Sequence, residues 1–503
     1  MRSGDAPRSV SQGFALAIAL LALVAAAKPI LYGTIDPDCF WHLRVAEQLH
    51  RDGIRPLVDD ISFASIKTPW TPYSWLAELG MKWVWDRGGY RAAVGMQSLL
   101  MAAFVVLIAL ACRERASVCE PGSGGTEART NSVALPVIVA TALGMYWALP
   151  YLSFRPVTFA LALLALCAWL IARDRRLDES SRAAWFIVPL TALLTNIHFF
   201  AFLIPAALGA NMISSARKRR MASLLLLTSL ASCATPMLPG ILRSIARYQF
   251  SDPMLSIDFV AEFQPFYAGP LAWLSVSLVL TSVALAIWKR DQLRPSDWIM
   301  LIGAVALLLR LGRFAPVFAI VAAPILATTM PRMSGAVLAR KPVIAALATV
   351  LLIGIIRIAT SFPARDVPID QWLNRLGDDT PGYPCVAARF VEQNIRPTSG
   401  RLVNEFSWGG YLAWRFADRF LILMDGRTQL YAPEFWRAAY ASDRADLIKL
   451  VGAEGRADAA ILPIEKSRLR ADLIDRGWKS VYRDGRAEVL VPAESPLVAR
   501  ASD

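Results

Sequence analysis

"FALAIALLALVAAAKPILYGTIDPDCFWHLR" runs from Phe14 to Arg44 and changes character sharply after Tyr32. Its first part, Phe14 to Tyr32, is an apolar run with one charged residue, Lys28, and has the length that crosses a hydrocarbon core, about 20 residues. Its last part places two carboxylates, a thiol, an imidazole and a guanidinium between Asp36 and Arg44. The stretch therefore predicts a membrane helix that leads directly into a chemically reactive segment.

The composition extends this reading to the whole chain. The 503 residues are 55% hydrophobic with a mean hydropathy of +0.43, which is more apolar than soluble domains. The first apolar run is not followed by a small-residue cleavage site, so we read it as an uncleaved anchor. The net charge of +13 is explained by basic cytoplasmic loops rather than by nucleic acid. We predict a polytopic α-helical membrane protein.

The apolar runs predict about eleven transmembrane helices. We place them near residues 14–34, 92–112, 132–150, 156–172, 184–196, 199–214, 221–238, 269–288, 297–311, 314–330 and 342–360. Basic residues concentrate in alternate connections, which puts the N-terminus in the cytoplasm and the C-terminus in the periplasm of a bacterial cell. The expected location is the bacterial inner (cytoplasmic) membrane. The two short spans, 184–196 and 199–214, are expected to form a hairpin with "TNIHFF" at its tip. A polar tip at membrane depth needs a cavity that is filled with water or lined by protein.

Two regions lie outside the predicted membrane part, residues 1–360. The first periplasmic loop, 35–91, contains a helix ending at Gly53 and an aromatic amphipathic helix in "WTPYSWLAELGMKWVWDRGG", both expected to lie in the interface. The second is residues 361–503. There "RLVNEF", "RFLILMDG", "ADAAILPIE" and "AEVLVP" read as strands, with helices in "GGYLAWRF" and "PEFWRAAYASDRADLIKLVG". This alternation predicts a small C-terminal α/β extracytoplasmic domain.

The six cysteines are scattered and form no CxxC pair, which disfavours a zinc site. Only Cys39 and Cys385 fall outside the membrane on the periplasmic side, and nothing in the sequence shows that they pair.

With this topology, several polar residues gather on the outer face. Ionisable groups near membrane depth are costly, so they are functional candidates. We predict catalytic roles for Asp36, Asp38 and His42. The predicted substrate-binding residues are Trp75, Glu78, Arg155, Asn196, His198, Glu262, Arg310 and Arg313.

A structural interpretation stands beside each of these roles. Asp36-Pro37-Asp38 has the composition of a helix cap and turn, and His42 could simply bond a neighbouring carboxylate. The arginines could be interface anchors that snorkel. The segment from Asn196 to His198 could be a satisfied buried turn. Loops on one face share that face by definition, so both interpretations stay open.

The chemistry of these groups fits a substrate that is part lipid and part polar. An Asp can take a proton from an attacking hydroxyl, and arginines can hold a leaving phosphate in forked hydrogen bonds. The pair Asp36 and Asp38 could instead hold a divalent metal, Mg or Mn, that bridges the phosphate. No GxGxxG, GxxxxGK[ST] or HExxH motif occurs in the right context, which disfavours a nucleotide cofactor and a zinc protease.

At these motifs the chain resembles a known group. "DPDCFWHLRVAEQLHRDGIRPLVDDISFASIKTPWTPYSWLAE", "TNIHFF", "AEFQP" and "NEFSWGGYLAWRF…LILMDGRTQLY" are similar to patterns in bacterial membrane proteins of the GT-C glycosyltransferase superfamily. The nearest branches are RgtA/B/C/D-like and dolichyl-phosphate-mannose mannosyltransferase-like. The resemblance implies a many-helix fold with a soluble outer domain, a polyprenyl-phosphate-linked sugar donor, and Asp36 or Asp38 as base or metal ligand. Arg155, Arg310 or Arg313 would face the phosphate.

Three functions follow as hypotheses. The first is sugar transfer from a polyprenyl-phosphate-linked donor to an outer-face acceptor in the cell envelope: a glycan, a lipid or a protein. The second is a lipid or polysaccharide transporter or flippase, which usually needs symmetric repeats; the sequence shows none. The third is a non-catalytic scaffold whose outer domain binds a ligand, with "WGGYLAW" and "MDGRTQLY" as the features to watch. In that region Gly409-Gly410 would permit a close approach of backbone or ligand, and Asp425–Arg427 could be a structural pair.

Overall fold

The structure is a computed structural model that describes residues 6–32, 35–117, 126–250, 265–268, 272–375, 382–440, 445–451, 457–465 and 467–497. The chain divides into two compact units, each built from segments far apart in the sequence. Unit 1 comprises Met1–Leu31, Val94–Thr235 and Asp258–Phe362, and unit 2 comprises Tyr32–Ala93, Pro236–Ile257 and Pro363–Asp503.

Unit 1 is helical. Its helices are α1 (Ala6–Tyr32), α4 (Thr126–Ala148), α5 (Pro156–Arg176), α6 (Ile187–Thr195), α7 (Leu203–Ser214), α8 (Lys218–Ala231), α10 (Ala272–Trp288), α11 (Pro295–Arg310), α12 (Ala315–Thr329) and α13 (Lys341–Ser361). Within the described chain, six helical segments are long and apolar enough to cross a membrane: Val10–Tyr32, Trp75–Ala116, Ser132–Tyr151, Pro156–Arg176, Gly312–Thr329 and Lys341–Ser361. The membrane-helix prediction is confirmed, and the count of about eleven stays a prediction.

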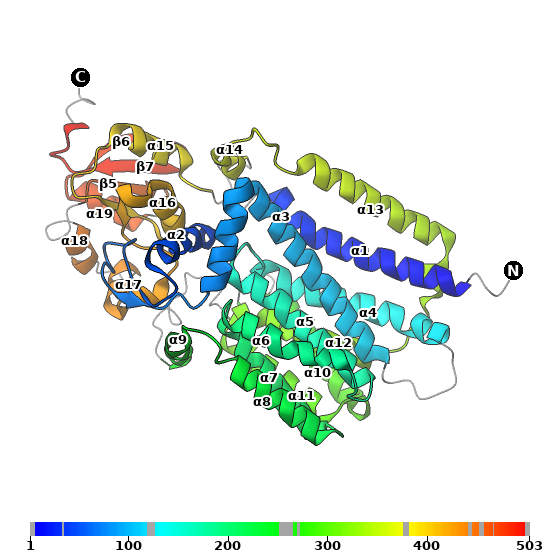
Figure 1. Cartoon of the computed structure of the whole chain (residues 1–503). Helices are drawn as coiled ribbons and strands as arrows, with labels where there is room; N and C mark the ends of the chain where they lie inside the picture. Colours follow the sequence, from blue (N-terminus) through cyan, green and yellow to red (C-terminus); the bar gives the residue numbers. More distant parts are fainter. Residues whose placement is uncertain are drawn as a thin grey trace. The chain divides into compact units, whose positions relative to one another are not determined.

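Helix α12 lies at the centre of unit 1. Its residues are mostly small and almost all buried, and it packs against α4, α5, α10 and α11. The rings of Trp147 and Phe318 meet edge to face at 4.8 Å between centroids. In contrast, α13 has no buried residue and runs beside α1 (Figure 1), where Gly354 faces Leu23. An apolar helix with such exposure is suited to face lipid.

Two predicted membrane segments have different bounds. The span expected at 221–238 ends early, because α8 stops at Ala231 and a separate helix, α9 (Leu238–Phe250), follows the turn. Pro236 lies in that turn and cannot continue a helix. The span expected at 92–112 belongs to the longer α3 (Trp75–Ala116), whose two arms join at a kink where Gly89 has φ of +56°.

The kink has a physical reason. A straight helix of this length would run about 60 Å, roughly twice the thickness of the hydrocarbon core. Glycine tolerates positive φ, so Gly89 lets the aromatic arm from Trp75 diverge from the membrane arm. The first arm belongs to unit 2 and the second to unit 1.

Unit 2 contains a five-stranded sheet with the order β4-β3-β5-β7-β6. Strands β3 (Arg401–Asn404), β4 (Leu421–Ile422) and β5 (Ala459–Pro463) are parallel, and β7 (Ala487–Val491) runs antiparallel to β5 and to β6 (Lys479–Arg483). Figure 1 shows α15 and α16 beside the strands. The accompanying helices are α14 (Ile369–Asn374), α15 (Cys385–Asn394), α16 (Gly409–Phe416), α17 (Pro433–Tyr440), α18 (Ala445–Val451) and α19 (Arg468–Asp475).

The first loop is part of this same unit. It contains α2 (Pro37–Asp52) and a short hairpin of β1 (Leu57–Val58) and β2 (Pro69–Trp70). Beyond the hairpin's first strand, Ser62 forms a parallel bridge with Ile422 on the edge strand β4. The N–H of Ile422 donates to the carbonyl of Ile61 at 3.0 Å, and the N–H of Phe63 donates to the carbonyl of Ile422 at 2.9 Å. The first loop therefore extends the C-terminal sheet. The division at residue 360 stays a prediction.

Candidate functional site

Asp36 and Asp38 lie at the first turn of α2. Asp36 is the N-cap residue, and its Oδ1 accepts a hydrogen bond from the Asp38 N–H at 2.9 Å. Pro37 occupies the first helical position, where its missing N–H costs nothing. The capping interpretation therefore describes Asp36. Asp38 occupies the second helical position and is half-buried.

The carboxylate of Asp38 lies against the turn formed by Asp425, Gly426 and Arg427, which we call the DGR turn. A Cβ atom added at Gly426 would collide with Asp38 Oδ1, and it would also meet the indole nitrogen of Trp41. Only a glycine leaves room for the aspartate here. The Asp-Gly-Arg pattern and the first-loop aspartate, almost 390 positions apart in sequence, are thus brought together within unit 2.

His42 and Glu78 form a buried pair. His42 Nδ1 and Glu78 Oε1 are 3.0 Å apart, and the residues are 6% and 1% exposed. Glu78 lies on α3, so this hydrogen-bond partner of His42 comes from a different helix. Trp75, three residues before Glu78, is half-buried. Among the described residues, Glu78 Oε2 and the Trp41 indole nitrogen are buried without a hydrogen-bond partner.

A second polar group in unit 2 is a fully buried ion cluster. Arg427 donates to Asp59 Oδ1 at 2.7 Å and makes a forked contact with Asp425, including Oδ2 at 2.6 Å. Burial alone would lower the pKa of Arg427, but the carboxylates of Asp425 and Asp59 outweigh it and raise the pKa. The guanidinium also lies over the Trp70 ring at 5.3 Å. The expected Asp425–Arg427 pair is present, and Asp59 is its unforeseen third member.

Two glycines bring α16 close to the rest of unit 2. A Cβ at Gly409 would meet the carbonyl oxygen of Met424, and one at Gly410 would meet the carbonyl oxygen of Pro37. The predicted close approach is therefore of backbone to backbone. Above this contact the buried ring of Phe40 is surrounded by Tyr383, Tyr411 and Trp414 at 5.1 to 5.4 Å.

Unit 1 contains the hairpin tip. His198 caps a short 3₁₀ turn, with Nδ1 accepting from the Phe200 N–H at 3.3 Å. Burial, and then the positive charges of Arg313 and Arg155, hold the pKa of His198 well below its ordinary value. The ring is therefore neutral at pH 7, close to two cations. Phe200 in turn contacts Phe314, next to Arg313, at 5.8 Å between ring centroids.

The remaining predicted residues have varied positions. The Asn196 side chain donates to the carbonyls of Ala192 and Ala234 at 2.8 and 2.9 Å, so it ties the hairpin tip to the turn after α8. Arg155 precedes α5, and its Nε donates to Ser153 Oγ. Arg310 is exposed at the end of α11. Glu262 lies outside the described residues.

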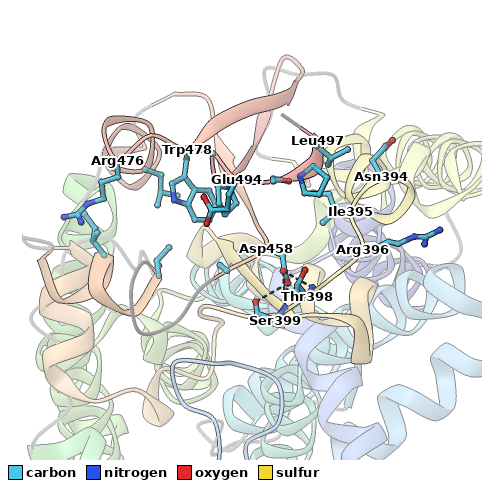
Figure 2. A pocket seen from close by; sticks show the side chains of 18 of the residues that line it. Asn394, Ile395, Arg396, Thr398, Ser399, Asp458, Arg476, Trp478, Glu494 and Leu497 are labelled. Carbon is cyan, nitrogen blue, oxygen red and sulfur yellow. Dashed lines mark hydrogen bonds between the residues drawn. The ribbon is translucent and has the colours of Figure 1, made fainter. Parts of the chain in front are cut away.

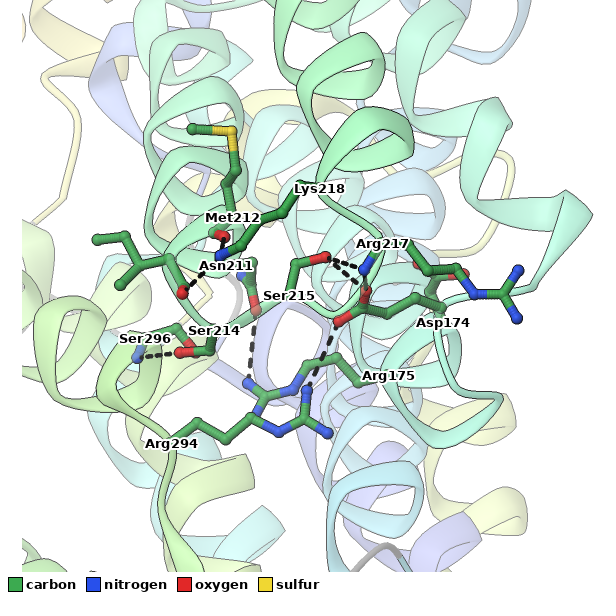
Figure 3. Close-up of polar contacts among 12 residues, drawn as sticks. Asp174, Arg175, Asn211, Met212, Ser214, Ser215, Arg217, Lys218, Arg294 and Ser296 are labelled. Atoms are coloured by element: carbon green, nitrogen blue, oxygen red, sulfur yellow. Dashed lines mark hydrogen bonds and ion pairs between the residues drawn. The ribbon is translucent and has the colours of Figure 1, made fainter.

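At the other end of the same helices, basic residues pair with acids. Asp297 accepts from Arg115 at 2.8 Å and from Arg175 at 2.6 Å, and all three are buried. Nearby, Ser215 Oγ donates to Glu179, and Arg217 N–H donates to both (Figure 3). The predicted basic connections therefore share one end of unit 1. Their side of the membrane stays a prediction.

A cavity of about 1020 Å³ lies in the C-terminal part of unit 2 (Figure 2). Trp478, Glu494 and Arg396 line it, and Asp458 forms its floor while accepting from the backbone N–H groups of residues 398–401. None of the predicted site residues lines this cavity.

The described chain holds no group of three or more His, Cys, Asp or Glu side chains arranged to bind a metal. The described cysteines, Cys39 and Cys385 included, are free. The metal prediction therefore concerns the pair Asp36 and Asp38 alone.

No protein-family model matches the chain, and no curated protein matches it significantly. Among solved structures, it is similar to ArnT from Cupriavidus metallidurans bound to undecaprenyl phosphate, with 13% identity and a TM-score of 0.46 over 96% of this chain and 98% of that one. It is also similar to the oligosaccharyltransferase AglB from Archaeoglobus fulgidus in complex with an inhibitory peptide and a dolichol-phosphate, with 13% identity and a TM-score of 0.40 over 90% and 69%.

The expected likeness to membrane glycosyltransferases is thus found again among solved structures.

Proposed function

We propose that the protein is a membrane glycosyltransferase that moves a sugar from a polyprenyl-phosphate-linked donor to a hydroxyl of an outer-face acceptor. Asp38 is the proposed general base. The observation that carries this choice is the difference between the two aspartates: Asp36 is engaged as the helix cap, whereas Asp38 is held against Gly426 and Trp41. A positioned carboxylate beside buried polar groups is what proton abstraction requires.

The proposed step is an inverting transfer. The acceptor oxygen attacks the anomeric carbon of the sugar while Asp38 takes the hydroxyl proton. The bond between the anomeric carbon and the phosphate oxygen breaks, and the phosphate leaves on the lipid. The unsatisfied Trp41 N–H and Glu78 Oε2 are a donor and an acceptor suited to sugar hydroxyls, because buried polar atoms gain most from a partner.

Unit 1 contains the arginines that we propose as contacts to the donor phosphate. Arg155 and Arg313 both act on His198, and two guanidinium groups are suited to a phosphate monoester or diester. We propose His198, which lies beside these two guanidinium groups, as a further contact to the donor. Arg310 is proposed as a further contact to the donor phosphate.

Two carboxylates from one helix turn fit Mg²⁺ or Mn²⁺ held with water and substrate phosphate oxygens. Asp36 and Asp38 would be those ligands, and a metal bound there would neutralise charge on the leaving phosphate.

The competing functions make different demands. A flippase needs a polar pathway and usually internal symmetry, and the central helix α12 is apolar and almost completely buried. A scaffold gives no reason for the unsatisfied Trp41 N–H beside Asp38 or for the unsatisfied Glu78 Oε2.

The test is mass spectrometry of cell-envelope glycans from a deletion strain complemented with wild type, Asp36→Asn or Asp38→Asn. We expect a glycan to be lost on deletion, restored by wild type, and absent with Asp38→Asn. Asn caps helices about as well as Asp, so Asp36→Asn keeps the fold and should restore some glycan. Restoration by both variants at wild-type level would refute the base, and an unchanged glycan profile on deletion would refute glycosyl transfer in the envelope.

A further inference from the structure

The DGR turn is held rigidly on every side. The Asn404 side chain, wholly buried at the end of β3, accepts from the Leu423 N–H and donates to the Met424 carbonyl, each at 2.8 Å. The Asp425 N–H donates to the Tyr431 hydroxyl at 2.9 Å, and the Asp425 carboxylate accepts from the Arg427 N–H at 2.8 Å. Such bonding leaves the turn little freedom to move.

The same turn is fixed to the first loop. Arg427 bonds Asp59 at 2.7 Å, and Ser62 Oγ donates to the Leu423 carbonyl at 2.7 Å. All these groups are buried, where hydrogen bonds to charged partners are strongest. The first loop and the C-terminal sheet are therefore joined by buried bonds close to the turn.

Gly426 is the point where this frame touches Asp38. The missing side chain leaves a space that the Asp38 carboxylate and the Trp41 indole border directly. An aspartate on a helix's first turn has two side-chain torsions, so a fixed wall on one side restricts where its oxygens can lie. Catalytic groups work only when held near the productive geometry by such support.

We infer that the DGR turn is a positioning element for Asp38, with Gly426 as the positioning residue. This inference rests on the proposed function and extends it, because it makes the C-terminal sheet part of the catalytic apparatus. Gly426 itself contacts no substrate, and it acts only through Asp38.

The substitution Gly426→Ala tests this inference sharply. The added methyl group would meet the Asp38 carboxylate first and then the Trp41 indole nitrogen, both side-chain atoms rather than backbone, so we expect Asp38 to rotate away while the fold persists. Gly80→Ala is the matched control, because a Cβ at Gly80 meets nothing within 4 Å. Vesicles from the deletion strain, which carry the native donor and acceptor, serve as the probe, with purified variant added and vesicle concentration varied.

We expect Gly426→Ala to lower apparent kcat about 10- to 100-fold, since small misplacements of catalytic groups have effects of this size, with apparent KM within about twofold of wild type. Gly80→Ala should match wild type. A Gly426→Ala rate equal to wild type would overturn the inference.

Thermal unfolding supplies a readout that needs no activity. If the methyl group meets Asp38, the loss of melting temperature caused by Gly426→Ala should shrink in an Asp38→Ala background, where the carboxylate is gone. An equal loss in both backgrounds would overturn the contact. If the proposed function is wrong, Asp38→Asn protein added to the vesicles will transfer sugar normally while this thermal coupling persists. That outcome separates failure of the proposed function from failure of the positioning inference.

Discussion

Arg427 lies wholly buried between two carboxylates, one two positions before it and one 368 positions away in the first loop. A guanidinium can serve both because its five N–H donors form a planar fork. The cluster carries one more negative charge than positive, so its stability depends on the bonds that the remaining carboxylate oxygens make. The Asp59 carboxylate accepts hydrogen bonds from the Ser65 hydroxyl at 2.8 Å and from two backbone N–H groups.

Removing this cation should be severely destabilising. Arg427→Met leaves Asp59 and Asp425 buried and uncompensated, and breaking a buried pair in this way costs about 3–5 kcal/mol. The thermal midpoint of the purified protein measures the loss. Arg389→Met is the control, because Arg389 pairs with Asp370 at a half-exposed position and such pairs contribute about 1 kcal/mol or less. Similar midpoints for the two variants would contradict the assignment.

Glu488 should give the sheet an acid-dependent stability. Burial alone would raise the pKa of this carboxyl, but hydrogen bonds from Ser480 and Arg470 outweigh it and lower the pKa below the ordinary value of 4.5. The stabilisation is therefore present above about pH 4.5 and is lost as pH falls through the folded-state pKa. Glu488→Gln should flatten the dependence of the thermal midpoint on pH between about 5 and 3. An unchanged slope would show that Glu488 contributes nothing.

At the scale of elements, the contact of α16 with α2 depends on Gly410. At Gly410 an added methyl group would press on the carbonyl oxygen of Pro37, and backbone cannot rotate away as a side chain does. We expect Gly410→Ala to destabilise unit 2 by about 1–3 kcal/mol, the range for overpacking. Thermal unfolding measures this against Gly80→Ala, which should be neutral or slightly stabilising. A neutral Gly410→Ala would mean that α16 is free to shift.

Elements with a strong local pattern could be predicted from the sequence. The helix ending at Gly53, the strands around Leu402, Ile422 and Ile461, and the glycine-dependent approach of α16 all rest on signals within a few residues. Strand β6 was not predicted because "KSVYR" is polar, and its side chains are half-exposed or exposed at the sheet edge. An edge strand gains less from burial and shows weaker alternation.

The site was only partly predictable for a related reason. Capping by Asp36 follows from adjacent residues, but the pairing of Asp59 with Arg427 and of His42 with Glu78 depends on tertiary contacts. The hydrophobic periodicity and the turn residues of a segment do not predict which charged residues from distant segments will pair. The first-loop and Asp-Gly-Arg patterns were recognised as separate motifs, and only the structure brings Asp38 to Gly426.

At the scale of the molecule, the orientation in the membrane is a prediction open to direct labelling. The basic connections share one end of unit 1, which the positive-inside rule assigns to the cytoplasm. Cysteines introduced at two exposed positions, Arg219→Cys and Glu494→Cys, report on the two sides in a Cys233→Ser background. An impermeant thiol reagent should label the second in cells whose outer membrane is permeabilised, and the first only after lysis. The reverse pattern would invert the topology.

The fold of the first loop should depend on the C-terminal segment. A chain ending at Phe362 keeps all six candidate spans but removes the rings around Phe40, the guanidinium beside Asp59 and the strand edge at Ile422. Phe40 would lose its apolar surroundings and Asp59 its compensating charge, so residues 35–74 should lose their fold. Limited proteolysis followed by mass spectrometry should find new cleavages there, with the helices of unit 1 cut as in the full chain. Equal protection of residues 35–74 in both chains would show that the loop folds without the sheet, and the C-terminal segment would then have no part in holding Asp38.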